Sequence, residues 1–167
     1  MNQKDTVIVS IDFQERLVPA MVDSKPMIEE AVKLLKGANI LGIPVLFTQQ
    51  YTRGLGDTVP EIKDVCPEFS YIEKQSFSVA GAKEFCERLD ELKPKNIIII
   101  GIETHICVLQ SALDLLDKGF TERGGHLRLR RILPLNRPAG PHSPPPASPS
   151  TRTRCRKETT CVVRISS

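Results

Sequence analysis

Residues 96–101 read Asn-Ile-Ile-Ile-Ile-Gly, and no other part of the chain has so clear a strand pattern. Four consecutive isoleucines favour a strand, and a continuous apolar run is typical of a strand that is buried on both faces. A helix is expected next, from near His105 to Lys118, because apolar residues recur there at helical spacing. This segment therefore predicts one strand–helix unit of a parallel sheet.

The same alternation of strands and helices precedes this unit. Strands are expected at 6–11, 45–48 and 71–74, and helices from residue 24 to the break at 42–44 and from about 79 to 92. Such alternation indicates an α/β protein in which a parallel sheet is covered on both faces, a three-layer, Rossmann-like architecture. Ligands of these sheets bind beyond the carboxyl ends of the strands.

Three chemically useful residues lie at such strand ends. Asp12 follows the strand 6–11, Lys74 ends the strand 71–74, and Cys107 lies in the first turn of the helix after 96–101. A helix N-terminus lowers a thiol pKa, a carboxylate can take the thiol proton, and an ammonium can hold both anions in place. Taken singly, these residues have ordinary explanations as a small core side chain, a helix cap and a solvated charge. Their shared position at one sheet edge predicts a nucleophile with its activators.

Length and composition fit one globular domain. The chain has 167 residues, 40% of them hydrophobic and 26% charged, which argues against a wholly disordered or fibrous protein. No apolar run approaches the roughly 20 residues that span a bilayer, and the first residues do not resemble a signal peptide. We therefore expect a cytoplasmic protein with no membrane partner. Its five cysteines, an odd number without framework spacing, favour free thiols.

The average composition conceals two different parts. Residues 1–120 contain 13 basic and 18 acidic residues, a net charge of −5, whereas residues 121–167 contain 10 basic and 2 acidic residues, a net charge of +8. All eight aromatic residues lie in the first part, and seven of the 13 prolines lie in the second. We therefore expect an α/β domain over 1–120 and a basic, Pro- and Arg-rich tail over 121–167 that is largely disordered.

Three segments around the candidate residues have a recognisable pattern. They are Ile-Asp-Phe-Gln at 11–14, Glu-Lys-Gln-Ser-Phe-Ser at 73–78 and Gly-Ile-Glu-Thr-His-Ile-Cys-Val at 101–108. They resemble the first-strand motif, the lysine segment and the nucleophile segment of the isochorismatase-like cysteine hydrolases. Residues 49–56 and 59–61 further resemble the branch that includes the isochorismatase domain-containing proteins. The resemblance stops near residue 120, where family members continue with further strands and helices, so it implies an incomplete domain.

The resemblance implies a mechanism. Asp12 would take the proton of Cys107, and the thiolate would attack a carbonyl or imine-like carbon while Lys74 steadies the charges. Water would then hydrolyse a thioester-type intermediate. The resemblance also implies a cis peptide bond between Ile102 and Glu103, which would direct the N–H groups of Glu103 and Cys107 at the oxyanion.

The expected substrate is a small amide- or ester-like molecule, and no cofactor is implied. Candidate pocket walls are Phe13, Gln50, Tyr51 and Phe77, although Phe13 and Phe77 have an equally good explanation as core residues.

Nicotinamidases of this superfamily bind a metal through an aspartate and several histidines. His105 is the only histidine in residues 1–120, so a His-rich metal site cannot be built there and we expect no metal. True isochorismatases need not use the cysteine, so Cys107 gives no support to that substrate. A folded product is expected to form homo-oligomers.

The tail leaves alternatives open. It is interpreted first as a frameshifted or misjoined translation, second as a basic appendage that binds nucleic acid or an anionic surface, and third as a proline-rich ligand of SH3-type domains. The rival functions are accordingly an inactive truncated paralogue that acts as an interaction module and a nucleic-acid binder that uses the basic tail alone. Without the family's next strand, the edge of the strand 96–101 and one helix face would be exposed, which predicts a marginally stable product.

Overall fold

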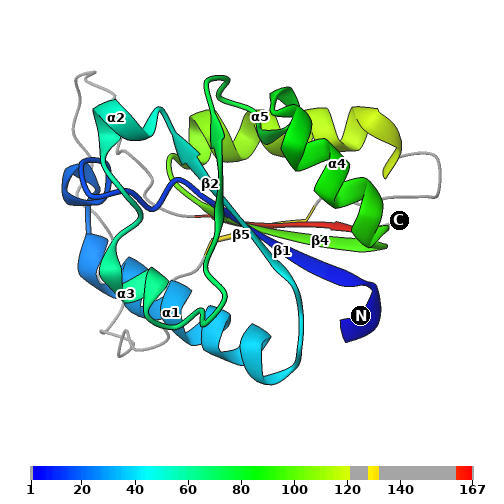
Figure 1. Cartoon of the computed structure of the whole chain (residues 1–167), viewed down its shortest axis with the longest axis horizontal. Coiled ribbons are helices and arrows are strands. Elements are labelled where there is room, and N and C mark those ends of the chain that lie inside the picture. The colour runs from blue at the N-terminus through cyan, green and yellow to red at the C-terminus, as the bar shows by residue number, and fades with distance from the viewer. Residues whose placement is uncertain (1, 121–127, 132–160, 167) are drawn as a thin grey trace, which may run out of the picture.

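The protein folds into a sheet with helices on both faces (Figure 1), as the computed structural model shows for residues 2–120, 128–131 and 161–166. The described strands are β1 (Thr6–Ile11), β2 (Val45–Gln50), β3 (Tyr71–Lys74), β4 (Asn96–Gly101), β5 (Arg128–Arg131) and β6 (Cys161–Ser166). They lie in the order β3-β2-β1-β4-β6-β5. The strands β1 to β4 are mutually parallel, which confirms the predicted α/β class with a parallel sheet.

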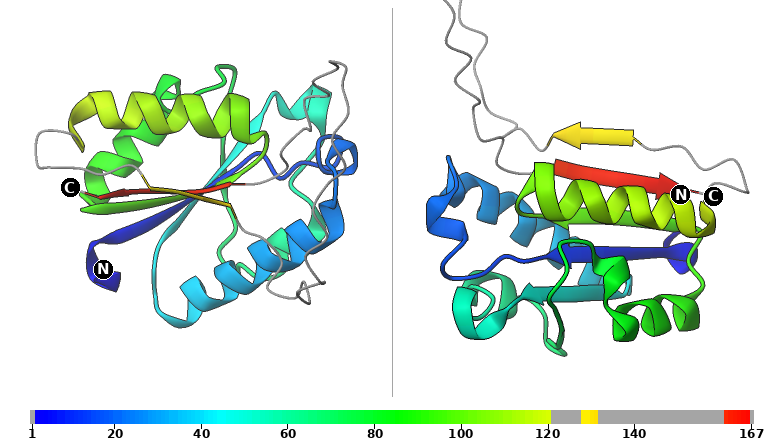
Figure 2. Two further views of the ribbon diagram at one scale, coloured as in Figure 1. Left: turned by 180° about the vertical axis from the view of Figure 1, so that it is seen from behind. Right: turned by 90° about the horizontal axis from the view of Figure 1, so that it is seen from above.

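Helices connect the parallel strands and form the two outer layers (Figure 2). The α-helices are α1 (Ser24–Ile40), α2 (Thr52–Leu55), α3 (Pro60–Lys63), α4 (Lys83–Leu92) and α5 (Leu109–Leu115). Short 3₁₀ turns are η1 (Gln3–Asp5), η2 (Val18–Ala20) and η3 (Val79–Gly81), and π-helical turns are η4 (Thr104–Val108) and η5 (Leu116–Phe120). Helices α1 and α3 lie on one face, and α4 and α5 lie on the other. None of the helices in the described part of the chain is long and apolar enough to cross a bilayer.

The four isoleucines of β4 fill both faces of the sheet. Ile97 and Ile99 belong to the apolar cluster that contains residues of α4 and α5, whereas Ile98 and Ile100 belong to the cluster that contains residues of α1. Each of the four is at most 9% exposed. Because successive side chains of a strand point to opposite faces, a strand covered on both sides is apolar at every position. This burial explains the run of isoleucines.

Most predicted element boundaries agree with the structure. The strands 6–11, 71–74 and 96–101 have the predicted limits, and β2 continues two residues past the predicted end, to Gln50. The predicted helix 79–92 is divided into η3 and α4. The predicted helix 105–118 begins at Thr104 with the π-helical turn η4, so that Cys107 lies in this turn rather than in a regular α-helix.

The edge of β4 is paired, contrary to the expectation of an open edge. β6 runs antiparallel along the whole of β4, from Ser166 beside Asn96 to Cys161 beside Gly101, and β5 pairs with the far side of β6. β6 includes the run Cys-Val-Val-Arg-Ile at 161–165, whose β-branched residues favour a strand. Leu109 and Leu113 of α5 are 36% and 48% exposed, so part of that helix face is open to solvent. The predicted disorder of the tail concerns mainly 121–127 and 132–160, which lie outside the described residues.

Candidate active site

Asp12 is placed at the carboxyl edge of the sheet by the end of β1. Its backbone adopts a left-handed conformation with φ of 57°, which aspartate tolerates better than most residues. Its N–H donates to the carbonyl oxygen of Thr48 at 3.1 Å, so the chain is still fixed to β2 one residue beyond β1. The residue is fully buried. A carboxylate in this position needs partners, because an unpaired buried charge is strongly unfavourable.

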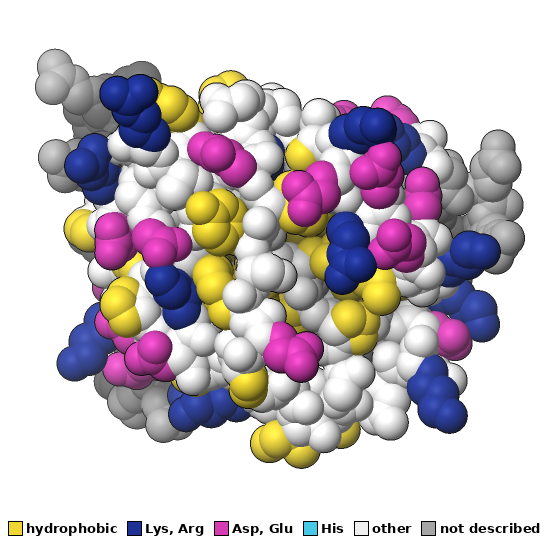
Figure 3. All heavy atoms as spheres, in the orientation of Figure 1, with side chains coloured by type: hydrophobic (Ala, Val, Ile, Leu, Met, Phe, Trp, Pro, Cys, Tyr) yellow, Lys and Arg dark blue, Asp and Glu magenta, His cyan; other side chains and the backbone are white. Residues whose placement is uncertain are grey.

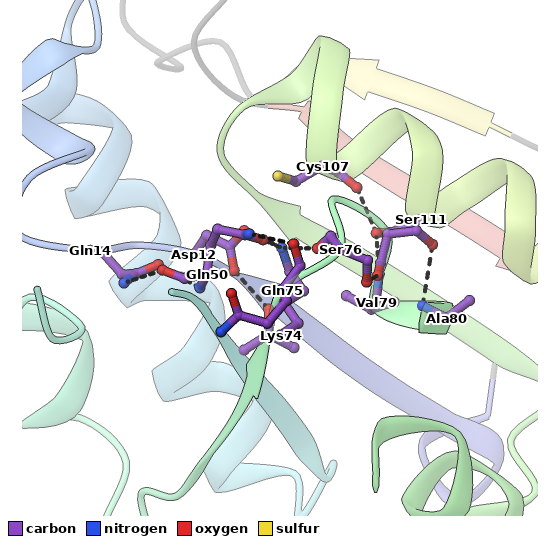
Figure 4. A network of polar contacts seen from close by, with 12 residues as sticks. Asp12, Gln14, Gln50, Lys74, Gln75, Ser76, Val79, Ala80, Cys107 and Ser111 are labelled. Atoms are coloured by element: carbon purple, nitrogen blue, oxygen red, sulfur yellow. Dashed lines mark hydrogen bonds and ion pairs between the residues drawn. The ribbon is translucent and has the colours of Figure 1, made fainter. Parts of the chain in front are cut away.

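Lys74 supplies the opposite charge from the end of β3 (Figure 4). Its Nζ lies 2.6 Å from Asp12 Oδ2 and 2.7 Å from Gln50 Oε1, and it also donates to the carbonyl oxygen of Ser76 at 3.3 Å. A lysine ammonium has three N–H donors, so all three are used. Both charged side chains are completely buried. The pair is therefore a desolvated, hydrogen-bonded ion pair, and loss of either partner would leave a buried charge.

The second oxygen of Asp12 is also engaged. Thr48 Oγ1 donates to Asp12 Oδ1 at 3.0 Å. Burial raises the pKa of Asp12 above its ordinary value, while the Lys74 ammonium, the Thr48 hydroxyl and the nearby Cys107 thiol act against this rise. The three predicted residues, Asp12, Lys74 and Cys107, thus lie together.

Cys107 is a buried thiol, 7% exposed, at the start of the helical segment that follows β4. Burial raises its pKa to about 11, with the negative charge of Asp12 acting in the same direction and the Lys74 ammonium in the opposite one. The predicted lowering of this pKa by a helix N-terminus was therefore wrong, because desolvation and the neighbouring carboxylate dominate. In the resting site the thiol keeps its proton, and a base is required to remove it.

The segment after Lys74 is tied to the turn that carries Cys107. Ser111 Oγ donates to the carbonyl oxygen of Cys107 at 2.5 Å and accepts a hydrogen bond from the N–H of Val79 at 3.0 Å (Figure 4). Both Ser111 and Val79 are completely buried. The Ser111 hydroxyl therefore fixes the backbone just after the lysine segment 73–78 relative to the turn that carries Cys107.

The roles of Thr48 and Ser111 were not predicted from the sequence, and neither was that of Gln14, a buried glutamine whose side chain bonds the backbone of Gln50 and Gly56. The four-residue spacing between Cys107 and Ser111 places them on one helical face, which is a usable signal. Thr48 was assigned only to a strand, and its role depends on the neighbouring strand order. Gln14 has no local signal, because the residues that its side chain contacts are 36 and 42 positions away.

The other predicted site residues have different surroundings. The peptide bond between Ile102 and Glu103 is cis, as predicted. Phe13 is 1% exposed within the apolar cluster of α1, which agrees with its alternative explanation as a core residue. Tyr51 and Phe77 are 49% and 54% exposed.

Metal ligands are not grouped in the described part of the chain. Within it, no three His, Cys, Asp or Glu side chains are close enough together to hold an ion. His105 is exposed, and its Nε2 lies 3.6 Å from the Glu103 carboxylate. The absence of a metal or cofactor from the reaction stays a prediction.

Two solved structures share this fold. The MAR1 ribonuclease of Caenorhabditis elegans matches with a TM-score of 0.66 and 35% identity, over 71% of this chain and 61% of that protein. YcaC of Pseudomonas aeruginosa, solved with hexane-2,5-diol and covalent acrylamide, matches with a TM-score of 0.65 and 25% identity over the same shares of the two chains.

Sequence comparison identifies the family. Isochorismatase domain-containing protein 1 of Salmo salar is 38% identical over 115 residues, which are 69% of this chain and 40% of that relative. The chain therefore spans less than half the length of this relative. The family model for the isochorismatase domain matches residues 6–122. This match covers most of the chain and includes Asp12, Lys74 and Cys107, and the chain therefore belongs to the isochorismatase family.

Proposed function

We propose that this protein is a cysteine hydrolase of small amide- or ester-like substrates, in which Cys107 is the nucleophile, Asp12 the general base and Lys74 the cation that keeps Asp12 ionised. One observation carries the proposal: a buried carboxylate and ammonium form an ion pair at the carboxyl edge of a parallel sheet, and a buried thiol lies near enough to both for their charges to act on its pKa. This is the arrangement of a nucleophile with its base and a third group that orients the base.

The high pKa of Cys107 defines the first step. As the sulfur attacks the substrate carbonyl carbon, its proton moves to Asp12, the new C–S bond forms, and the electron pair of the C=O bond moves to oxygen. Backbone N–H groups of Glu103 and Cys107 would stabilise this oxyanion. Collapse expels the amine or alcohol, which takes the proton back from Asp12. Water then attacks the thioester and gives one proton to Asp12. The C–S bond breaks, the Cys107 sulfur takes that proton back from Asp12, and the acid is released.

Lys74 acts in this scheme through charge rather than through substrate contact. Its three N–H groups are already bound to Asp12, Gln50 and Ser76. Burial favours the protonated form of Asp12, and the ammonium opposes this effect, so that Asp12 is available as a base. Among the predicted pocket walls, Gln50, Tyr51 and Phe77 remain candidates for contacts with substrate, since Phe13 is buried in the core.

The likeness to YcaC supports a nucleophile in this fold. That protein holds covalent acrylamide, and acrylamide is an electrophilic amide that reacts with nucleophilic side chains. The substrate class and the nucleophile are nevertheless proposals for this chain, as are its cytoplasmic location and its assembly into oligomers.

A panel of small p-nitrophenyl esters and primary amides tests the function. The full chain is expected to hydrolyse at least one, and Cys107→Ala to abolish turnover. Cys86→Ala is the matched control, because Cys86 is a half-buried thiol on α4 outside the site. Mass spectrometry should detect an acyl adduct on the Cys107 peptide. Hydrolysis that persists in Cys107→Ala would overturn the assignment.

A second candidate is cleavage of RNA, favoured by the 35% identity to the C. elegans ribonuclease. Against it, residues 1–120 have a net charge of −5, and on the face that Figure 3 presents, acidic and basic side chains are interspersed. RNA cleavage that is lost in Cys107→Ala would favour this function. Salt-sensitive RNA binding that disappears on deletion of 121–167, without cleavage, would favour a tail-dependent binder. A chain with none of these activities would be an inactive paralogue.

A further inference from the structure

Gln14 is a completely buried glutamine just beyond the end of β1. Its side chain makes three hydrogen bonds: Oε1 accepts from the N–H of Gln50 at 2.7 Å, while Nε2 donates to the carbonyl oxygens of Gln50 at 3.1 Å and Gly56 at 2.6 Å. A primary amide that bonds both the N–H and the C=O of one residue acts as a neighbouring strand would. Gln14 thus extends the pairing of β2 after β1 has ended.

The residue fixed in this way is the one that contacts Lys74. Gln50 Oε1 accepts from Lys74 Nζ at 2.7 Å, and Gln50 Nε2 donates to the carbonyl oxygen of Gln75 at 3.0 Å (Figure 4). Both ends of the Gln50 side chain are therefore engaged with the lysine segment. Apart from Asp12, this amide oxygen is the nearest acceptor to the Lys74 ammonium.

We propose that Gln14 is a positioning residue of the active site: it fixes the backbone of Gln50, whose side chain holds the Lys74 ammonium against Asp12 and Cys107. The inference rests on the proposed function of these three residues. It assigns a role in the chemistry to a buried amide that touches no reacting atom.

Gln49, the neighbour of Gln50 in β2, offers a matched control for Gln14. It is also completely buried, and its amide also makes three hydrogen bonds, to Asp57 Oδ1 at 2.6 Å, Thr58 Oγ1 at 3.0 Å and Thr52 Oγ1 at 2.9 Å. These partners belong to the connection after β2, and none of them contacts Lys74. Replacement of either glutamine by methionine removes a buried amide at similar side-chain length, so both variants carry a comparable structural cost.

The test measures the titration of Cys107, which needs no substrate. The full chain, Gln14→Met, Gln49→Met and Gln50→Met are alkylated with iodoacetamide between about pH 7 and pH 11, and the Cys107 peptide is quantified by mass spectrometry. Because the Lys74 ammonium lowers the pKa of Cys107, a less firmly held ammonium raises the alkylation midpoint. We expect Gln14→Met and Gln50→Met to raise it, and a rise of about 0.5 in pH makes alkylation at pH 9 about threefold slower. Gln49→Met should keep the parental midpoint.

The double variant Gln14→Met/Gln50→Met shows whether Gln14 changes the alkylation midpoint of Cys107 through Gln50 or whether the two glutamines act independently. If Gln14 acts through Gln50, the double variant has the midpoint of Gln50→Met alone. Equal midpoints in Gln14→Met and Gln49→Met, or fully additive changes in the double variant, would overturn the inference even if the chain is an active hydrolase. A raised midpoint in a chain without hydrolase activity would show that Gln14 positions the Lys74 ammonium, but it would remove the proposed function and with it the role of Gln14 in catalysis.

Discussion

Two charged neighbours act in opposite directions on the acidity of Cys107. Asp12 raises the thiol pKa and Lys74 lowers it, on top of the larger rise caused by burial. In the proposed mechanism, the same carboxylate that makes the thiolate rare is the base that takes the thiol proton during attack. Thiol acidity and catalytic competence are therefore separate properties of this site, and a change of Asp12 should move them in opposite directions.

Asp12→Asn tests this separation. Removal of the negative charge lowers the pKa of Cys107, so alkylation of Cys107 at about pH 8.5 should become faster, by about tenfold if the pKa falls by about 1. Turnover of any hydrolysed substrate should fall by about 100-fold or more, because the general base is lost. Alkylation rates from peptide mass spectrometry and initial rates of hydrolysis provide the two readouts. Slower alkylation in Asp12→Asn would contradict the electrostatic role given to Asp12.

The Cys107 thiol should also make the fold sensitive to alkali. The folded chain keeps this proton up to about pH 11, whereas the unfolded chain gives it up near the ordinary thiol pKa of 9.0. The folded state thus binds more protons in this window, and its stability falls as pH rises from 9 to 11, by about 2–3 kcal/mol. Urea unfolding at about pH 8.5 and about pH 11 should show this loss in the parent. Cys107→Ala should lack it, and equal pH dependence of the two chains would contradict the buried-thiol assignment.

At the scale of elements, the close approach of β1 and β4 sets the distance between Asp12 and the nucleophile turn. Gly101 ends β4 with φ of 157°, and a Cβ there would lie 2.5 Å from both the Cβ and the carbonyl oxygen of Ile11. That carbonyl accepts a hydrogen bond from the N–H of Ile102 at 3.1 Å. There is no room for a side chain between the strands at this point.

Gly101→Ala should therefore destabilise the chain by about 2 kcal/mol or more, because backbone atoms must move to admit the methyl group. Gly37→Ala is the control, since Gly37 lies within α1 and a Cβ at that position would meet nothing within 4 Å. A helical glycine replaced by alanine stabilises by about 0.5–1 kcal/mol. Urea denaturation should give opposite signs for the two variants, and the same sign for both would argue against the tight β1–β4 contact.

The limits of sequence reasoning are visible in the same elements. The four isoleucines of β4 predict a strand because a strand buried on both faces is apolar at every position. Asp12, Lys74 and Cys107 could be grouped from the sequence because parallel strands end at one edge of the sheet. Gln14 and Thr48 could not be assigned, since the partners of their side chains lie 36 or 42 residues away in the sequence. The acidity of Cys107 was predicted in the wrong direction because burial, which outweighs a helix terminus, is a property of the packed fold.

At the scale of the whole molecule, the acidic α/β domain of residues 1–120 pairs with a strand from the basic segment 121–167. Residues 1–120 carry a net charge of −5 and residues 121–167 a net charge of +8, yet β6 from the second part pairs with β4 from the first. The four parallel strands of this chain are thereby covered on one side by an antiparallel strand. Since β4 is the strand that leads to Cys107, a free edge of β4 would be both a site of aggregation and a source of local opening.

Deletion of residues 161–167 should accordingly expose the edge of β4. Backbone amides of Ile97, Ile98, Ile99 and Ile100 that pair with β6 should exchange hydrogen faster in the truncated chain, and light scattering should rise at lower temperature and concentration than in the parent. The amides of β1, which pairs with β2 and β4, serve as the internal control, because they keep their partners. Val163→Pro tests the same contact without truncation, since Val163 lies opposite Ile99 and a proline inside a paired strand disrupts its ladder. If the exchange of β4 amides is the same in the parent and both variants, β6 does not cover this edge in solution and the strand that leads to Cys107 is an open one.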